Sequence, residues 1–238
     1  MTDLLFRDDP YLREAPATVT AITSEGGIVL DRSLFYPTSG GQPGDAGRLV
    51  WEGGQIDIAT TVKVDGAPNL LLPAEPVALP AAGQEVMQVL NWDRRYRHMR
   101  MHTALHLLSV VIPLPVSGGA IASDKSRLDF DMPEAPEDKQ ALEDDLNRLI
   151  ACNMDVMSEW ITDAALDAQP DLVKTMSVQP PRGSGQIRLI RIGVGPETAD
   201  LQPCGGTHVA NTSEVGTVRL GKIQKKGRQN RRVYLHLE

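Results

Sequence analysis

Short strand-like runs of apolar, often β-branched residues mixed with polar ones dominate the first third of the chain. ATVTAI at 17–22 and GQEVMQVLN at 83–91 are two examples, and glycines separate such runs. The two strand-like arms of GRLVWEGGQIDIATTVKV meet at Gly53-Gly54, a spacing typical of a hairpin. Many short strands with glycine between them predict a small Gly-rich β-barrel, or a sandwich, in residues 1–90.

The pattern changes after residue 90, where apolar positions recur with the helical period of 3.6. Asn91 or Asp93 can cap a helix that ends near Val111. A second helix is predicted to begin at Pro136, with acidic residues in its first turn. Strand-like runs follow at 186–193, 216–226 and 231–238. Residues 91–238 are therefore predicted to form an α+β domain.

Composition and charge narrow the class of protein. A net charge of −7 argues against a general coat for nucleic acids. The charge is uneven, because Glu134–Asp171 holds 11 acidic and 2 basic residues, and the remainder can therefore offer a basic surface. The two cysteines make no disulfide framework in a chain this long. Without a predicted signal segment or membrane span, we expect a cytoplasmic protein with no membrane partner.

Histidine and cysteine fall into two spaced pairs. His102 and His106 lie four residues apart in MHTALHLLSV, and Cys204 and His208 lie four apart in PCGGTHV. On a helix, positions i and i+4 share a face. Imidazole and thiolate are the ligands that zinc prefers, usually four in a tetrahedron. The two pairs together predict one zinc site, and the plainer alternative is two unrelated packed sites.

His98 competes for a place in this site, since it lies on the same helix face. His98 and His106 are roughly 12 Å apart along the axis and cannot share one ion. His98 stands among arginines, in a turn expected to be wet, whereas His106 stands among leucines. The pair of His102 and His106 is therefore preferred. Thr103 occupies the position at which HExxH proteases carry the glutamate that acts as general base, which argues against a peptidase. The remaining alternatives are hydrolysis of a more reactive bond, such as an activated ester, and a purely structural zinc.

These motifs resemble a known family. RMHTALHLL followed far downstream by CGGTHV resembles the zinc motif of the alanyl-tRNA synthetase editing domain and of its free-standing relatives, the AlaX family of alanyl-tRNA editing proteins. FYPTSGGQPGDAG at 35–47 resembles the Gly-rich segment of the β-barrel before that domain, and SDKSRLDFD and TMSVQPPRG are also similar to family segments. The resemblance is to the medium-length form, and implies a barrel in 1–90 and an α+β editing domain of the alanyl/threonyl-tRNA synthetase type in 91–238.

The resemblance also implies an activity, the hydrolysis of the aminoacyl ester in mischarged Ser-tRNA(Ala), with Gly-tRNA(Ala) as a further candidate. It implies Zn²⁺ held by His102, His106, Cys204 and His208, which either activates a zinc-bound water or holds the substrate's α-amino group. Thr103 resembles the polar pocket residue that meets the serine hydroxyl, and the alternative is a threonine merely tolerated on a helix. The alternative function is a zinc-stabilised tRNA-binding module without turnover.

Two basic runs, RRYRHMR at 94–100 and KIQKKGRQNRR at 222–232, form a candidate phosphate track for the tRNA acceptor end. Solvated faces are the plainer interpretation. The predicted RNA-binding residues are Arg94, Arg95, Arg97, Lys222, Lys225, Lys226 and Arg228. The glycine-rich segment at 35–47 lacks the GK[ST] ending of a phosphate loop. We expect it to serve as turns in the barrel, and the resemblance adds contact with tRNA or with the editing domain.

Overall fold

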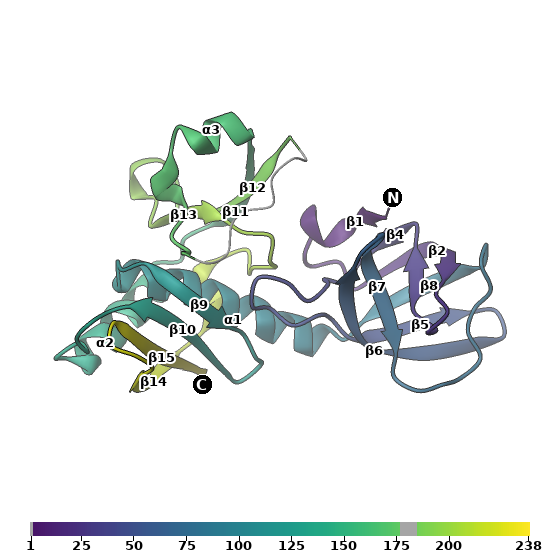
Figure 1. Cartoon of the computed structure of the whole chain (residues 1–238), viewed down its shortest axis with the longest axis horizontal. Coiled ribbons are helices and arrows are strands. Elements are labelled where there is room, and N and C mark those ends of the chain that lie inside the picture. The colour runs from purple at the N-terminus through teal and green to yellow at the C-terminus, as the bar shows by residue number, and fades with distance from the viewer. Residues whose placement is uncertain (1, 177–184) are drawn as a thin grey trace. The chain divides into compact units, whose positions relative to one another are not determined.

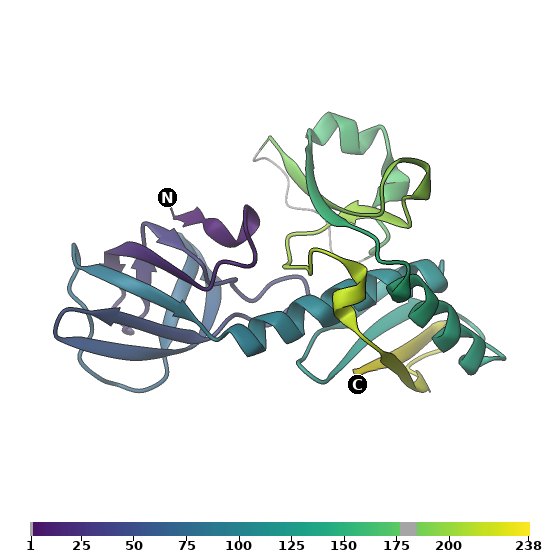
Figure 2. The same cartoon turned by 180° about the vertical axis from the view of Figure 1, so that it is seen from behind.

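The computed structural model describes residues 2–176 and 185–238. The chain folds as two compact units, Met1–Arg97 and His98–Glu238 (Figures 1 and 2). The domain boundary expected between residues 90 and 91 coincides with the end of a barrel strand, whereas the division between the units falls inside the helix that follows. Within the described ranges, no helix is both long and apolar enough to span a membrane.

The first unit contains a closed barrel of six strands in the order β2-β3-β7-β6-β5-β8, together with a small parallel pair, β1 and β4. The elements are β1 (Asp3–Leu4), η1 (Leu5–Arg7), β2 (Glu14–Ile22), β3 (Ile28–Leu30), β4 (Arg32–Ser33), β5 (Gly47–Trp51), β6 (Gly54–Val64), β7 (Ala67–Pro73) and β8 (Glu85–Leu90). The predicted barrel is confirmed. So is the predicted hairpin, because Trp51 pairs with Gly54 and Gly53 has the positive φ of 97° that such a turn needs.

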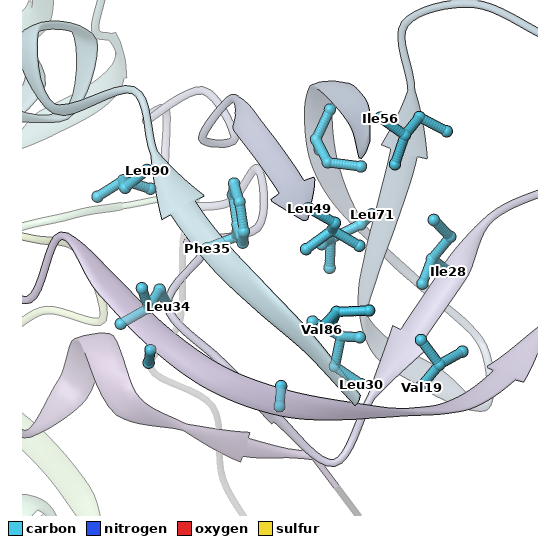
Figure 3. Close-up of a cluster of buried hydrophobic side chains, with 13 residues drawn as sticks. Val19, Ile28, Leu30, Leu34, Phe35, Leu49, Ile56, Leu71, Val86 and Leu90 are labelled. Carbon is cyan, nitrogen blue, oxygen red and sulfur yellow. The ribbon is translucent and has the colours of Figure 1, made fainter. Parts of the chain in front are cut away.

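Alternation of buried and exposed positions explains why these segments are strands. Along β8 the side chains at 86, 88 and 90 are buried, and those at 85 and 87 are exposed. The inward side chains are mainly aliphatic, and Val19, Leu30, Leu49, Leu71 and Val86 are each at most 3% exposed. Figure 3 shows these side chains filling the barrel interior. Closure pairs the edges that an open sheet of this size would leave free.

The glycine-rich segment at 35–47 is explained by turn geometry in the barrel unit. Ser39 and Gln42 pair across Gly40 and Gly41, whose φ angles of 54° and 82° are costly for other residues. A Cβ at Gly44 would lie 2.0 Å from the carbonyl oxygen of Thr61. The expectation of turns is confirmed, and contact of this segment with tRNA or with the editing domain stays a prediction.

The long helix α1 (Trp92–Val111) matches its prediction. The side chain of Asn91 caps it, with Oδ1 accepting from the amide of Arg94 at 3.2 Å. The start of the second helix was wrongly placed at Pro136, because α2 spans Lys139–Ala151. Asp138 has extended backbone angles, and its carboxylate accepts from the amide of Ala141, so the helix begins after this stronger cap.

The second unit also holds two antiparallel sheets, in the orders β14-β15-β10-β9 and β11-β12-β13. Its remaining elements are β9 (Val116–Ala120), β10 (Lys125–Asp131), β11 (Val156–Ile161), α3 (Asp163–Asp167), η2 (Pro170–Leu172), β12 (Ile187–Ile192), η3 (Gly195–Glu197), β13 (Asp200–Pro203), η4 (Thr212–Val215), β14 (Val218–Lys225) and β15 (Asn230–Leu237). The strands β12, β14 and β15 confirm the predicted runs and the α+β class. Most of TMSVQPPRG, residues 177–183, lies outside the described residues.

Candidate metal centre

Four side chains from distant parts of the second unit converge on one point. They are His102 and His106 of α1 together with Cys204 and His208 of the loop after β13, and their candidate ligand atoms all lie within 4.8 Å of one another. The Cys204 Sγ lies 3.5 Å from His102 Nε2 and 3.3 Å from His208 Nε2. The three histidines are each at most 7% exposed.

The geometry of this group fits a metal ion. With bonds of about 2.0 Å to nitrogen and 2.3 Å to sulfur, a tetrahedral site has nitrogen–sulfur edges of roughly 3.5 Å. The two measured sulfur–nitrogen distances, 3.5 and 3.3 Å, are close to that value. Three imidazoles and one thiol form the donor set, which suits zinc and other late transition metals. These four residues could therefore hold one metal ion.

Local structure explains how each pair is presented. The helical spacing of α1 places both histidines on one face. The second pair lies on a tight loop whose start is tied to the sheet, since the Cys204 amide donates to the Arg188 carbonyl at 3.1 Å. The Arg188 Nη1 donates to the carbonyls of Cys204 and Gly206, and the Gly206 amide points at the Cys204 sulfur at 3.4 Å. Arg188 thus fixes the loop from the neighbouring strand β12.

Electrostatics prepares the thiol and one imidazole for metal binding. Burial raises the pKa of the Cys204 thiol, but the adjacent imidazoles of His102 and His208 outweigh it and hold that pKa well below its usual range. Burial and the neighbouring His102 lower the pKa of His208 well below its usual value. A thiolate and a neutral imidazole are the forms in which these side chains bind metals.

His106 is held from behind by a buried carboxylate. Its Nδ1 lies 3.0 Å from Asp200 Oδ2, which also accepts from Gln202 Nε2 at 2.8 Å, and Lys174 Nζ donates to Asp200 Oδ1 at 2.5 Å. Burial lowers the pKa of His106, but Asp200 and the Cys204 thiolate outweigh it and raise the pKa to about 9. Burial raises the pKa of Asp200, but His106 and Lys174 outweigh it and lower the pKa to about 2. This contact fixes the ring so that its Nε2 is left for a metal.

Thr103 lies behind a second ligand. Its hydroxyl oxygen is 3.1 Å from His208 Nδ1 and accepts from the amide of Val209 at 3.3 Å. The side chain has no exposed surface. Its predicted contact with a substrate hydroxyl stays a prediction, and the observed contacts give Thr103 a role in orienting His208.

His98 lies outside the group of four. It is only 2% exposed, so the expectation of a wet setting was wrong. Two of the neighbouring arginines turn to the protein rather than to water, since Arg95 binds within the barrel unit and Arg100 donates to the Val215 carbonyl. The His98 Nε2 faces Ser123 Oγ at 3.4 Å.

The candidate RNA-binding residues differ in their exposure to solvent. The exposed group is Arg97, Lys222, Lys225, Lys226 and Arg228, and Arg94 is half-buried with a hydrogen bond to the Gly44 carbonyl. Arg95 has no exposed surface, because its guanidinium pairs with Asp45 and donates to the carbonyls of Pro10 and Leu34. Its burial removes Arg95 from the candidate RNA-binding surface.

Four residues around the metal centre were absent from the sequence interpretation: Lys174, Arg188, Asp200 and Gln202. The sequence pattern could have indicated two of them, Asp200 and Gln202. Asp200, Gln202 and Cys204 alternate in ADLQPC, and side chains two apart on a strand share a face. Lys174 and Arg188 are brought in by tertiary packing, which leaves no comparable pattern.

Comparison with known proteins identifies the family. The alanyl-tRNA editing protein AlaX-M of Methanosarcina acetivorans is 36% identical over 247 residues, which cover 100% of this chain and 99% of the relative. The corresponding protein of Methanosarcina barkeri is 38% identical over 249 residues, with the same coverage. The chain belongs to the AlaX family of alanyl-tRNA editing proteins.

Broader relatives agree with this family assignment. The alanine–tRNA ligase of Pyrobaculum arsenaticum is 32% identical over 231 residues, which cover 93% of this chain and 25% of the ligase. The family model for the threonyl and alanyl tRNA synthetase second additional domain matches residues 187–234, which include Cys204 and His208. The model for class II (A) tRNA synthetases matches residues 11–94, a range that contains the six barrel strands.

Proposed function

We propose that this protein is a zinc-dependent hydrolase that removes serine from mischarged Ser-tRNA(Ala), with Gly-tRNA(Ala) as a second substrate. The observation that carries the proposal is the convergence of three imidazoles and a thiol in a member of an alanyl-tRNA editing family. Such editing is needed because a pocket for a small apolar side chain rejects an analogue with one extra hydroxyl only weakly. The bond broken is the ester between the amino acid and the terminal ribose.

Zinc is the metal that we propose for this site. The donor set of nitrogen and sulfur disfavours magnesium and calcium, which prefer oxygen ligands. When bound, zinc would either lower the pKa of a water or hold the α-amino group of the substrate beside the ester. The chain's own residues would hold the ligands in place, with Asp200 orienting His106, Thr103 orienting His208 and Arg188 fixing the Cys204 loop. We retain Thr103 also as the candidate partner of a serine hydroxyl.

Binding of the tRNA acceptor end is proposed for the exposed basic residues and for half-buried Arg94. Lys222 lies on the outer face of the sheet β14-β15-β10-β9, where its ammonium is 5.6 Å from the ring centroid of Tyr234. Lys125 approaches the same ring at 4.4 Å. These cations lower the pKa of Tyr234, behind the larger effect of Arg232, which indicates positive potential on this face. Positive potential attracts the phosphate backbone of RNA. A tRNA substrate also implies a cytoplasmic location.

One observation favours a second candidate function, a zinc-stabilised tRNA-binding module without turnover. Four protein donors are available, and structural zinc sites are usually closed by four protein ligands. Catalytic zinc sites usually keep one position for water or substrate. The two candidates differ in a measurable way, because only the hydrolase frees the amino acid.

The deciding experiment follows release of labelled serine from Ser-tRNA(Ala). We expect multiple turnovers by the zinc-loaded protein, loss of activity after chelation, and recovery on adding zinc. Cys204→Ser should lose activity together with zinc. His98→Ala is the matched control, since this buried histidine of the same helix lies outside the group of four, and it should keep both. Binding of the tRNA without release of serine would support the module and refute the hydrolase.

A further inference from the structure

The sheet β11-β12-β13 has two faces with different neighbours. On one face, the apolar side chains of Ile187 and Leu189 of β12 pack against Leu166 of α3. Both views show α3 on the side of this sheet away from α1 (Figures 1 and 2). On the other face, Asp200 and Gln202 of β13 reach His106. We call this second face, which carries the even-numbered residues of β11, β12 and β13, the cluster face.

One row of residues crosses the cluster face from Cys204 to the edge of the sheet. Trp160 of β11 pairs with Arg188 of β12, and the Cys204 amide donates to the Arg188 carbonyl. All three residues have even numbers, so the alternation of side chains places them on the same face. With strands about 4.8 Å apart, the Cα atoms of Trp160 and Cys204 are separated by roughly 10 Å.

Trp160 is unusual in this position because its side chain is open to solvent. It is 44% exposed, although a large aromatic side chain gains most from burial. The two residues beside it on the same face are polar, exposed Ser158 on β11 and Arg188 on β12. Met157, which is also exposed, belongs to the opposite face. On the cluster face of β11, the exposed indole is therefore flanked by polar residues, and Ser158 separates it from half-buried Val156, the other apolar residue of this face of the strand.

We propose that Trp160 is a stacking platform for an unpaired base at the 3′ end of the substrate tRNA, and that it positions the aminoacyl ester at the metal centre. The inference rests on the proposed function, since it takes aminoacyl-tRNA as the substrate. The ester-bearing ribose must reach the group of four while its base, or the next one, lies one nucleotide's length away. Trp160 lies at that range from Cys204 and offers the π-face on which any base can stack.

The surroundings of Trp160 favour a base over a protein surface as its occupant. Protein interfaces need a contiguous apolar core, whereas the neighbours here, Ser158 and Arg188, are polar. Arg188 is also held rigidly, because its Nη1 binds the carbonyls of Cys204 and Gly206. Strand β12 therefore connects Trp160, which pairs with Arg188, to the Cys204 loop, which Arg188 holds in place. A base stacked on Trp160 would thus have a defined position relative to the metal ligands.

The first test measures steady-state deacylation of Ser-tRNA(Ala) by the zinc-loaded full chain. Trp160→Ala should raise KM by about 5- to 150-fold, the range expected for one lost base stack, with a smaller change in kcat. Trp160→Phe should restore most of the loss, since it keeps an aromatic face. Met157→Ala removes a similarly exposed apolar side chain from the opposite face of β11 and should leave KM unchanged.

A second measurement does not depend on turnover. Titration of the zinc-loaded protein with the RNA trinucleotide CCA should quench tryptophan fluorescence, and Trp160→Phe should remove that quenching, because the other tryptophans, Trp51 and Trp92, belong to the first unit. If wild-type protein quenches but never releases serine, the proposed function fails and the stacking platform stands.

Three results would overturn the platform. The first is an unchanged KM in Trp160→Ala with a wild-type protein that turns over. The second is quenching by CCA that persists in Trp160→Phe. The third is a thermal unfolding temperature that falls in Trp160→Ala but not in Met157→Ala, together with a KM that Trp160→Phe does not restore. That last pattern would assign the indole to packing of the sheet.

Discussion

Replacing Asp200 with asparagine tests whether the metal centre depends on the carboxylate behind His106. Asp200→Asn keeps the size of the side chain and removes its charge. The native carboxylate is buried and interacts with His106, Gln202 and Lys174. Asparagine can still accept a hydrogen bond through its Oδ1, but it carries no negative charge to stabilise a positive imidazole or to strengthen the contact with His106. Lys174 is partly exposed, so water can replace its lost partner.

The expected loss follows from the value of a hydrogen bond to a charged group. Such a bond contributes about 1.5–3 kcal/mol, which corresponds to roughly 10- to 150-fold in an equilibrium constant. Residues that orient metal ligands typically affect metal affinity by about 10- to 100-fold. We therefore expect Asp200→Asn to weaken zinc binding by about 10- to 100-fold, without unfolding the domain.

Competition with a coloured chelator measures this affinity, and circular dichroism monitors the fold. Glu159→Gln is the matched control, because Glu159 forms a carboxylate–guanidinium pair with Arg191 on the opposite face of the same sheet. It should leave zinc affinity unchanged. Equal affinity in Asp200→Asn and wild type would refute the orienting role, and an equal fall in both variants would assign the effect to general charge loss.

Three other predictions concern the same centre. His98→Ala should retain zinc while His106→Ala loses most of it, measured by elemental analysis; the reverse pattern would move the site up the helix. Thr103→Val should slow deacylation of Ser-tRNA(Ala) and Gly-tRNA(Ala) to the same extent, by up to about tenfold. The reason is that the Thr103 hydroxyl contacts His208, and one hydrogen bond contributes about 0.5–1.5 kcal/mol. Slower deacylation of the seryl substrate alone would instead show that Thr103 contacts serine. At pH 8, zinc binding should release about one proton, because the pKa of His106 is about 9 and His106 must become neutral to bind the metal. Calorimetry in two buffers measures the number of protons released, which should be smaller at pH 10. Release of no proton at pH 8 would contradict the raised pKa of His106.

The elements with strong local signals could be predicted from the sequence. Strand-like runs predicted β8 and β12, and the 3.6-residue period with a capping asparagine predicted α1 almost to the residue. The start of α2 was missed because Pro136 and Asp138 are both acceptable at a helix start, and only the backbone conformation shows which one is used. Local propensity does not decide between two such signals.

The centre shows the same division between local and distant information. Spacing and ligand chemistry selected Cys204 and His208 and limited the helical pair to two choices. The choice of His106 over His98 rested on the expected wet setting of His98, which was wrong. The contact between Thr103 and His208 joins residues 105 positions apart, and no periodicity encodes it. The burial of Arg95 has a similar cause, since its partner Asp45 lies 50 positions earlier. An arginine in a basic run is therefore predicted to be exposed unless its buried partner is known.

The buried pair of Asp45 and Arg95 determines where this protein can be cut for study in pieces. Arg95 is a residue of α1, yet its guanidinium is bound by Asp45 and by two carbonyls of the barrel unit. A barrel fragment ending at residue 90 would lose that cation, and removal of one member of a buried ion pair costs about 3–5 kcal/mol. That loss is a large part of the net stability of a small domain, about 5–15 kcal/mol. A fragment extended to Arg97 keeps the ion pair, so a fragment of the barrel unit should include the first residues of α1.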